Sequence, residues 1–208
     1  NEDQAEELLR LKINHPGISD AKRQELLHEA MWIFTTNAEA KEHNKRMMTH
    51  HVHKTNPLMN FGYKLVPSAN SKKDRGFFSH FAIKTRNSAS VPLCRGARIC
   101  LDRNIWTEAG LYNGAMGTVI DIRFAPGESP LQGNLPIYVI VKMDEYVGPI
   151  WDEKNPCHVP IPPMKGPCEK FCCEMEQVPV QLSFARTLHR FQGVSVGPGH
   201  AIPCMVLD

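Results

Sequence analysis

The sequence lacks the loop in which many ATP-hydrolysing proteins hold a triphosphate. The pattern G-x-x-x-x-G-K-[ST] occurs nowhere in its 208 residues, so the chain alone is not expected to bind a triphosphate in a P-loop. The H-E-x-x-H pattern of many zinc proteases is also absent. No nucleophile with a partnered base stands out, and we predict no catalytic residue in this chain.

Long hydrophobic runs are missing too. No segment approaches the roughly 20 apolar residues of a membrane span, and no charged-then-apolar leader is seen, so no membrane partner is expected. The seven cysteines are an odd number without the spacing of a disulfide framework. Reduced thiols are the default for such a chain, and we expect a nuclear or cytoplasmic protein.

Charge and length set wider bounds. The net charge of +2 and the pI near 8.2 permit a nucleic-acid partner without requiring one. At 208 residues the chain suits one large domain or two small ones. It begins with Asn1 rather than methionine, and an apolar run stops just before the last residue, Asp208. We therefore expect a piece of a longer protein.

A β-rich segment occupies the middle of the chain. Residues 97–101 alternate in polarity and residues 117–122 are rich in β-branched side chains, which predicts two strands. The turn between them contains Asn113 and Gly114, the dipeptide that most readily adopts positive φ. Further β-prone runs follow, and together they predict a small β-barrel over residues 96–161.

A strand, a turn and a helix are predicted before the barrel. The apolar run at residues 31–34 is typical of a buried strand. The polar turn after it includes Thr36 and Asn37, and Asn37 is expected to cap a helix that continues to about residue 50. This order of elements is typical of an α/β domain. Such a turn presents hydroxyl, amide and helix N–H groups where these sheets bind ligands.

Polar residues cluster after the barrel, between predicted strands at residues 178–184 and 201–207. The cluster spans residues 185–193 and offers a hydroxyl, an imidazole, two guanidinium groups and an amide. These groups suit phosphate oxygens, because arginine supplies forked charged donors and threonine a neutral one. A polar helix cap with exposed arginines explains the same residues equally well.

Two other groups of residues favour a structural interpretation. Lys72, Lys73 and Arg75 form a basic cluster, which is more often a solvated loop than a phosphate contact. Four cysteines near His158 lack paired C-x-x-C knuckles, which disfavours structural zinc, and we predict no metal site. These cysteines are Cys157, Cys168, Cys172 and Cys173.

Three separated stretches together resemble one family, the Pif and RecD-like superfamily 1 DNA helicases. Residues 96–122, with Gly-Leu-Tyr-Asn-Gly at 110–114, resemble the SH3-type barrel of that family. Residues 187–193, Thr-Leu-His-Arg-Phe-Gln-Gly, are similar to its motif V, and residues 34–44 to its motif IV. The three stretches also follow one another in the family's order, and the resemblance covers about residues 20–208.

The resemblance implies an α/β fold: a partial RecA-like motor domain, of the P-loop NTPase type, with the small β-barrel inserted in it. The chain would then divide into the N-terminal part of the second RecA-like domain (1–60), an irregular connection (61–95), the barrel (96–161), a loop (162–177) and a return to the RecA-like domain (178–208).

Family members use ATP and Mg2+ to move along single-stranded DNA, typically 5′ to 3′, in DNA repair, recombination or telomere maintenance. The first RecA-like domain, with its P-loop lysine and magnesium-binding acids, is missing here, as is the arginine of motif VI. This chain alone is therefore expected to be inactive. The alternative is a non-catalytic remnant that binds single-stranded DNA or serves as an interaction module.

The resemblance also implies roles for individual residues. Six would contact single-stranded DNA, namely Thr36, Asn37, Asn113, Thr187, His189 and Arg190. Two would couple the motion to the state of the nucleotide, namely Gln192 and Gly193.

Overall fold

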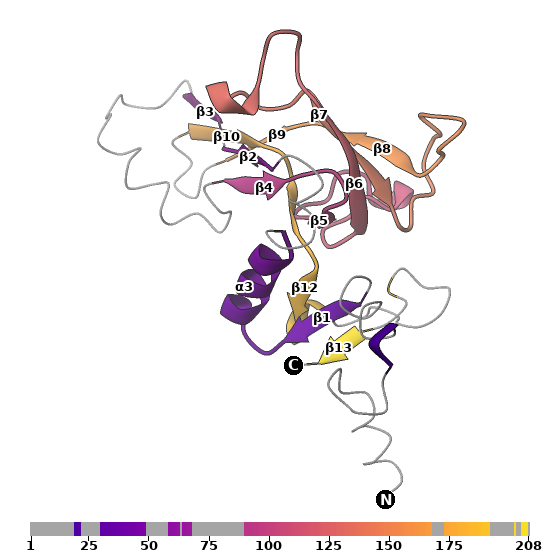
Figure 1. Ribbon diagram of the computed structural model, residues 1–208. Coiled ribbons are helices and arrows are strands. Elements are labelled where there is room, and N and C mark those ends of the chain that lie inside the picture. The colour runs from indigo at the N-terminus through magenta and orange to yellow at the C-terminus, as the bar shows by residue number, and fades with distance from the viewer. Residues whose placement is uncertain are drawn as a thin grey trace, which may run out of the picture. The chain divides into compact units, whose positions relative to one another are not determined.

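The computed structural model describes residues 19–21, 30–48, 58–62, 64–67, 90–167, 173–191, 202 and 205–207 (Figure 1). The chain divides into two compact units. The first unit consists of Asn1–Lys54 and Ser183–Asp208, and the second unit is Thr55–Leu182. The chain therefore leaves the first unit, builds the second and then returns to complete the first.

The first unit contains a parallel sheet of three short strands in the order β12, β1, β13. These strands are β1 (Met31–Phe34), β12 (Ala185–Thr187) and β13 (Met205–Leu207). All of β12 and three of the four residues of β1 are buried, as expected for strands covered on both faces. Helix α3 (Asn37–Met47) follows β1, and the 3-10 helix η4 (Leu188–Phe191) follows β12. Parallel strands followed by helices confirm the predicted α/β class.

Helix α3 begins with a capping box and buries one stripe of its surface. The Thr36 hydroxyl accepts a hydrogen bond from the Glu39 N–H, while the Glu39 carboxylate accepts one from the Thr36 N–H. The prediction that Asn37 caps this helix is wrong, because Asn37 is already its first helical residue. The buried residues recur at the spacing of one helix face and are Ala40, His43, Asn44 and Met47.

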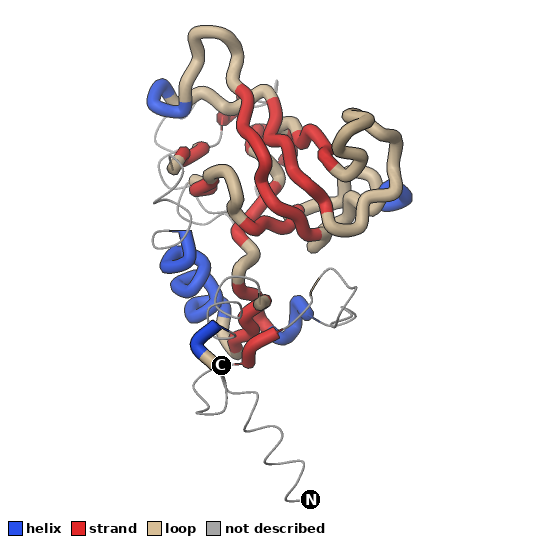
Figure 2. Tube along the Cα trace, turned by 45° about the vertical axis from the view of Figure 1, so that its right-hand side comes forward, coloured by secondary structure: helices blue, strands red, loops and turns tan. Residues whose placement is uncertain are grey.

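The second unit is built on a five-stranded antiparallel sheet in the order β11, β5, β6, β7, β8. Strands are drawn in red in Figure 2. Its strands are β5 (Arg98–Leu101), β6 (Met116–Arg123), β7 (Tyr138–Met143), β8 (His158–Ile161) and β11 (Val180–Leu182). Every second residue of β7 is buried, namely Val139, Val141 and Met143. The predicted strands between residues 96 and 161 are therefore confirmed, while their closure into a barrel stays a prediction.

Two smaller sheets lie where we predicted little regular structure. β2 (Met59–Phe61) pairs with β4 (Val91–Leu93). β10 (Cys173–Gln177) pairs on its two sides with β3 (Lys64–Pro67) and β9 (Met164–Pro167). The stretches predicted as an irregular connection and as a loop thus contain strands. Each strand is only three to five residues long, and β3 meets its partner more than 100 residues away in the sequence, so the local signal for these strands is weak.

Candidate nucleic-acid interface

Two polar segments leave the same edge of the parallel sheet in the first unit. In the register of β1 and β12, Phe34 is the partner of Thr187. Thr35 and Thr36 follow β1 directly, and Leu188 begins η4 directly after β12. Because the strands are parallel, both segments start at their carboxyl ends, where α/β sheets bind ligands. The structure therefore brings together the two segments that resemble motif IV and motif V.

The turn after β1 is occupied by a carboxylate of the protein itself. Glu39 Oε2 accepts hydrogen bonds from the hydroxyls of Thr36, at 2.6 Å, and Thr35, at 3.3 Å, and from the Thr36 N–H at 3.0 Å. The bonds from the Thr36 hydroxyl and then the Thr36 N–H lower the pKa of Glu39, which is ionised at neutral pH. A DNA phosphate at this turn would meet a negative charge where a helix N-terminus otherwise attracts an anion.

The side chains after β1 and β12 differ in their access to solvent. Thr36 and Asn37 are exposed on the turn that opens α3, and His189 is exposed on η4. Thr187, by contrast, is only 5% exposed, so a DNA contact by its hydroxyl needs the turn after β12 to open. Arg190 belongs to η4, and its side chain lies outside the described residues.

A buried asparagine joins α3 to β12. The Asn44 side-chain N–H donates to the carbonyl oxygen of Ala185 at 3.0 Å, and the Ala185 N–H donates to Asn44 Oδ1 at 2.8 Å. The amide thereby acts like one residue of an extra strand on the edge of β12. Ala185 is two residues before Thr187, so Asn44 fixes the strand that leads into the motif V-like turn. Our sequence reasoning missed this role, although a polar side chain in the buried stripe of a helix signals it.

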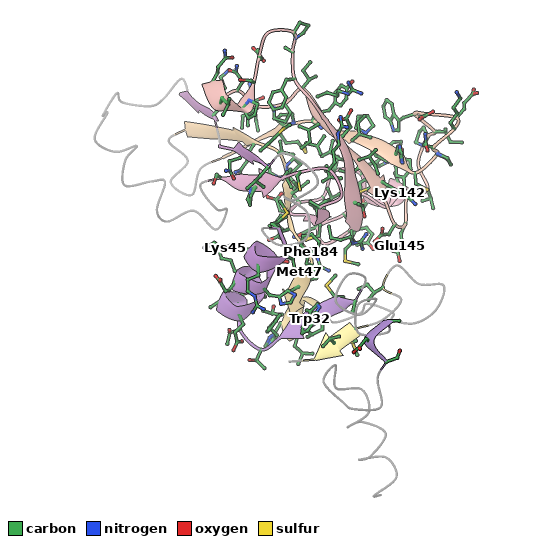
Figure 3. The ribbon with its side chains drawn as sticks, viewed as in Figure 1. Trp32, Lys45, Met47, Lys142, Glu145 and Phe184 are labelled. Carbon is green, nitrogen blue, oxygen red and sulfur yellow. The ribbon has the colours of Figure 1, made fainter. Side chains whose placement is uncertain are left out.

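Aromatic packing holds the other side of α3. The His43 ring centroid lies 4.6 Å from that of Trp32 and 5.3 Å from that of Phe34. Phe34 also belongs to a core cluster with Ala40 and Ala185, against which Trp32 packs (Figure 3). The helix therefore contacts β1 through rings and β12 through Asn44. These contacts fix the direction in which the turn at Thr36 leaves the sheet.

Asn113 lies in the second unit, in the turn before β6. Its side chain is exposed, and its backbone N–H donates to the side-chain oxygen of Asn104 at 2.7 Å. Gly114 has a φ of +100°, which confirms the positive φ predicted for this dipeptide. The Asn104 side chain thus supports this turn through the Asn113 N–H.

Several predictions fall outside the described residues. They include the nucleotide-coupling Gln192 and Gly193 and the basic cluster at residues 72–75. Residues 193–197 read Gly-Val-Ser-Val-Gly, which matches the G-x-S-x-G pattern of serine hydrolases, and they also lie outside. Among the described residues, no group of three or more metal-ligating side chains occurs. No helix in the same part of the chain is long and apolar enough to span a membrane.

The structure of this chain is similar to solved structures of Pif1 helicases. The Pif1 helicase from Candida albicans matches with a TM-score of 0.56 and 16% identity, over 94% of this chain and 46% of that one. The Bacteroides Pif1 helicase in complex with ADP-AlF3 and single-stranded DNA matches with a TM-score of 0.56 and 15% identity, over 100% and 45%. A structure of two coordinating Pif1 helicases at forked double-stranded DNA matches with 0.53 and 17%, over 88% and 37%.

These matches establish a fold. The resemblance to Pif-like helicases that we found in the sequence is confirmed at that level. No protein-family model matches the chain, and no curated protein matches it. The chain spans less than half the length of each of these helicases.

Proposed function

We propose that this chain is the C-terminal portion of an ATP-dependent DNA helicase that moves along single-stranded DNA and unwinds duplex DNA. One observation carries the proposal. The pairing of Phe34 with Thr187 sets the motif IV-like and motif V-like segments side by side on one sheet edge, in a fold shared with Pif1 helicases. The Bacteroides Pif1 helicase of that fold was solved with both ADP-AlF3 and single-stranded DNA, which supports both ligands.

In this proposal the sheet edge of the first unit contacts the DNA backbone. His189 and Arg190 supply cationic or polar donors from η4, and Thr36 and Asn37 supply neutral ones from the start of α3. Thr187 joins them when the turn after β12 opens.

The proposal includes two further roles. Gln192 and Gly193 relay the nucleotide state to the turn after β12. Asn113 is a separate contact on the second unit, at the turn that is expected to guide the strand.

ATP and Mg2+ belong to a different part of the protein in this proposal. They bind to a first RecA-like domain, which contributes the P-loop that the 208 residues lack. As is typical of the family that the sequence resembles, movement along the DNA runs 5′ to 3′ in this proposal. The chain by itself binds single-stranded DNA and does not hydrolyse ATP.

Binding of a labelled oligothymidylate, followed by fluorescence anisotropy over a range of salt concentrations, tests the interface. Arg190→Ala is expected to weaken binding and to reduce the salt dependence by about one phosphate contact. His189→Ala is expected to weaken binding at low salt. Lys45→Ala is the matched control, because it removes one positive charge from the last turn of α3, away from Thr36. Equal losses in all three variants would show nonspecific attraction and would refute the assignment.

A non-catalytic remnant that keeps only the DNA-binding surface is the second candidate. The observation that favours it is the absence of a P-loop from the sequence. The coding sequence on either side decides between the two. A P-loop upstream and an arginine-bearing motif VI downstream support the helicase, whereas start and stop codons flanking this frame support the remnant.

A further inference from the structure

The exposed apolar side chains of the second unit concentrate on two loops. Nine large hydrophobic residues are exposed in the described part of the chain, and five of them lie between residues 105 and 112 or between 147 and 151. We call these five the aromatic patch: Trp106, Tyr112, Val147, Ile150 and Trp151. Their exposed fractions run from 39% to 77%. Apolar groupings of this kind on a protein surface mark sites of interaction.

Hydrogen bonds join the two loops. The Val147 N–H donates to the carbonyl of Ala109 at 3.1 Å, and the Tyr112 hydroxyl donates to the Glu145 carboxylate at 3.1 Å. A Cβ on Gly110, whose φ is +84°, would lie 2.2 Å from the Glu145 carbonyl oxygen, so only glycine permits this approach. Figures 1 and 2 show the 3-10 helix η2 (Thr107–Ala109) beside the loop that follows β7. The two loops that carry the patch are thus joined to each other.

The second loop is also held from within. The Trp151 indole N–H donates to the Tyr146 hydroxyl at 3.0 Å, and that hydroxyl donates to the Pro149 carbonyl at 2.8 Å. Arg98 forms a forked pair with Asp144 at the start of the loop, with contacts of 2.9 and 2.7 Å. Trp151 is therefore exposed and yet fixed in place. A rigid aromatic side chain loses little conformational entropy when a partner covers it.

The two loops carry mostly negative charge, although Arg98 pairs with Asp144 and Lys154 follows the second loop. Residues 104–114 and 144–153 contain five carboxylates and no lysine or arginine. These acids are Glu108, Asp144, Glu145, Asp152 and Glu153. Hydrogen bonds from the Asn155 side chain and the Lys154 N–H lower the pKa of Asp152, so this carboxylate is ionised at neutral pH. Carboxylates grouped in this way attract lysine and arginine side chains.

We propose that the aromatic patch docks a protein segment that carries both basic and apolar side chains. Lysine or arginine side chains of this segment lie against Trp106, Tyr112 or Trp151 as cation–π partners and pair with the surrounding acids. Apolar side chains of the segment cover Val147 and Ile150. This site is distinct from the DNA-binding edge of the first unit and goes beyond the proposed helicase function.

The test measures binding of three labelled synthetic peptides of equal length to the 208-residue protein. The first alternates lysine and leucine, the second lysine and glycine, and the third glutamate and leucine. Only the first combines both chemistries, and we expect it to bind more tightly than the other two. Trp151→Ala is expected to weaken its binding at least about tenfold, as for an aromatic residue at the centre of an interface. Asp152→Asn is expected to weaken it less.

Controls separate this site from its alternatives. Leu131→Ala removes a 97% exposed apolar side chain from another loop and should leave peptide binding unchanged. Equal binding of the three peptides, or binding unaffected by Trp151→Ala, would overturn the proposal. Loss of oligothymidylate binding in Trp151→Ala would also overturn it, because the patch would then be a DNA surface. A dimer in sedimentation that Trp151→Ala abolishes would overturn it as well, because the patch would then be an interface between two copies of this chain. His189→Ala should leave peptide binding unchanged. Failure of the helicase proposal can therefore be distinguished from failure of the docking proposal.

Discussion

Replacing Asn44 by alanine should release β12 from helix α3. In the folded chain the Asn44 amide both donates to and accepts from the backbone of Ala185, at 3.0 and 2.8 Å. Asn44 is 9% exposed, so water has little access to these groups. Alanine cannot form either bond, and the N–H and carbonyl of Ala185 lose this partner inside the first unit.

The cost follows from the two backbone groups. A buried polar group that loses its hydrogen-bond partner costs about 1–3 kcal/mol, so the pair costs about 2–6 kcal/mol. The higher helix propensity of alanine offsets roughly 0.5 kcal/mol of this. We expect the free energy of unfolding to fall by about 2–5 kcal/mol, out of the 5–15 kcal/mol that is typical of a domain.

Urea unfolding followed by far-UV circular dichroism gives the change in stability. Hydrogen exchange at the Ala185 amide gives the local effect, because this N–H should lose its protection. Lys41→Ala is the control, since Lys41 is exposed on the same helix and should change stability by less than about 0.5 kcal/mol. A loss in Asn44→Ala no larger than that of the control, with the Ala185 amide still protected, would refute the reasoning.

Three further predictions concern charge and burial. Glu39→Gln keeps the hydrogen bonds of the capping box but removes its charge, so oligothymidylate binding at low salt should tighten about two- to fivefold; unchanged affinity would mean that no phosphate approaches this turn. Arg98→Lys keeps the charge but loses the fork to Asp144, and urea unfolding should show a loss of about 1–2 kcal/mol that Arg98→Ala exceeds. Burial raises the pKa of the Cys94 thiol to about 11, so the folded chain holds this proton where the unfolded chain releases it. Stability should therefore fall as the pH rises from about 9 towards 11, and Cys94→Ala should reduce that fall; an identical pH profile in the variant would contradict it.

The sequence predicted those elements whose signal is local. The apolar run at residues 31–34 and the β-branched run at 117–122 are strands in the structure, within one or two residues at their ends. The helix after Thr36 was predicted as well, although its cap was assigned one residue too late. In each case a few neighbouring side chains determine the preference for strand or helix, because hydrophobic periodicity and backbone propensity are properties of short segments.

The strands β9 and β10, and the pairing of β3 with β10, could not be predicted in this way. Lys64–Pro67 pairs with Cys173–Gln177, so the hydrogen-bond partners of one strand lie more than 100 residues away in the sequence. The pair of hydrogen bonds between Asn44 and Ala185 spans 141 residues and is equally invisible to a local pattern.

The sequence by itself determined the order of the two polar segments and the β-rich insert between them, and with it the resemblance to a helicase family. Only the tertiary structure decided which groups face a ligand. It buries Thr187 and fills the turn at Thr36 with the Glu39 carboxylate. It also joins two loops, 30 or more residues apart, into one acidic aromatic patch. Access to solvent and the sum of nearby charges depend on contacts between distant residues, and these exist only once the chain has folded.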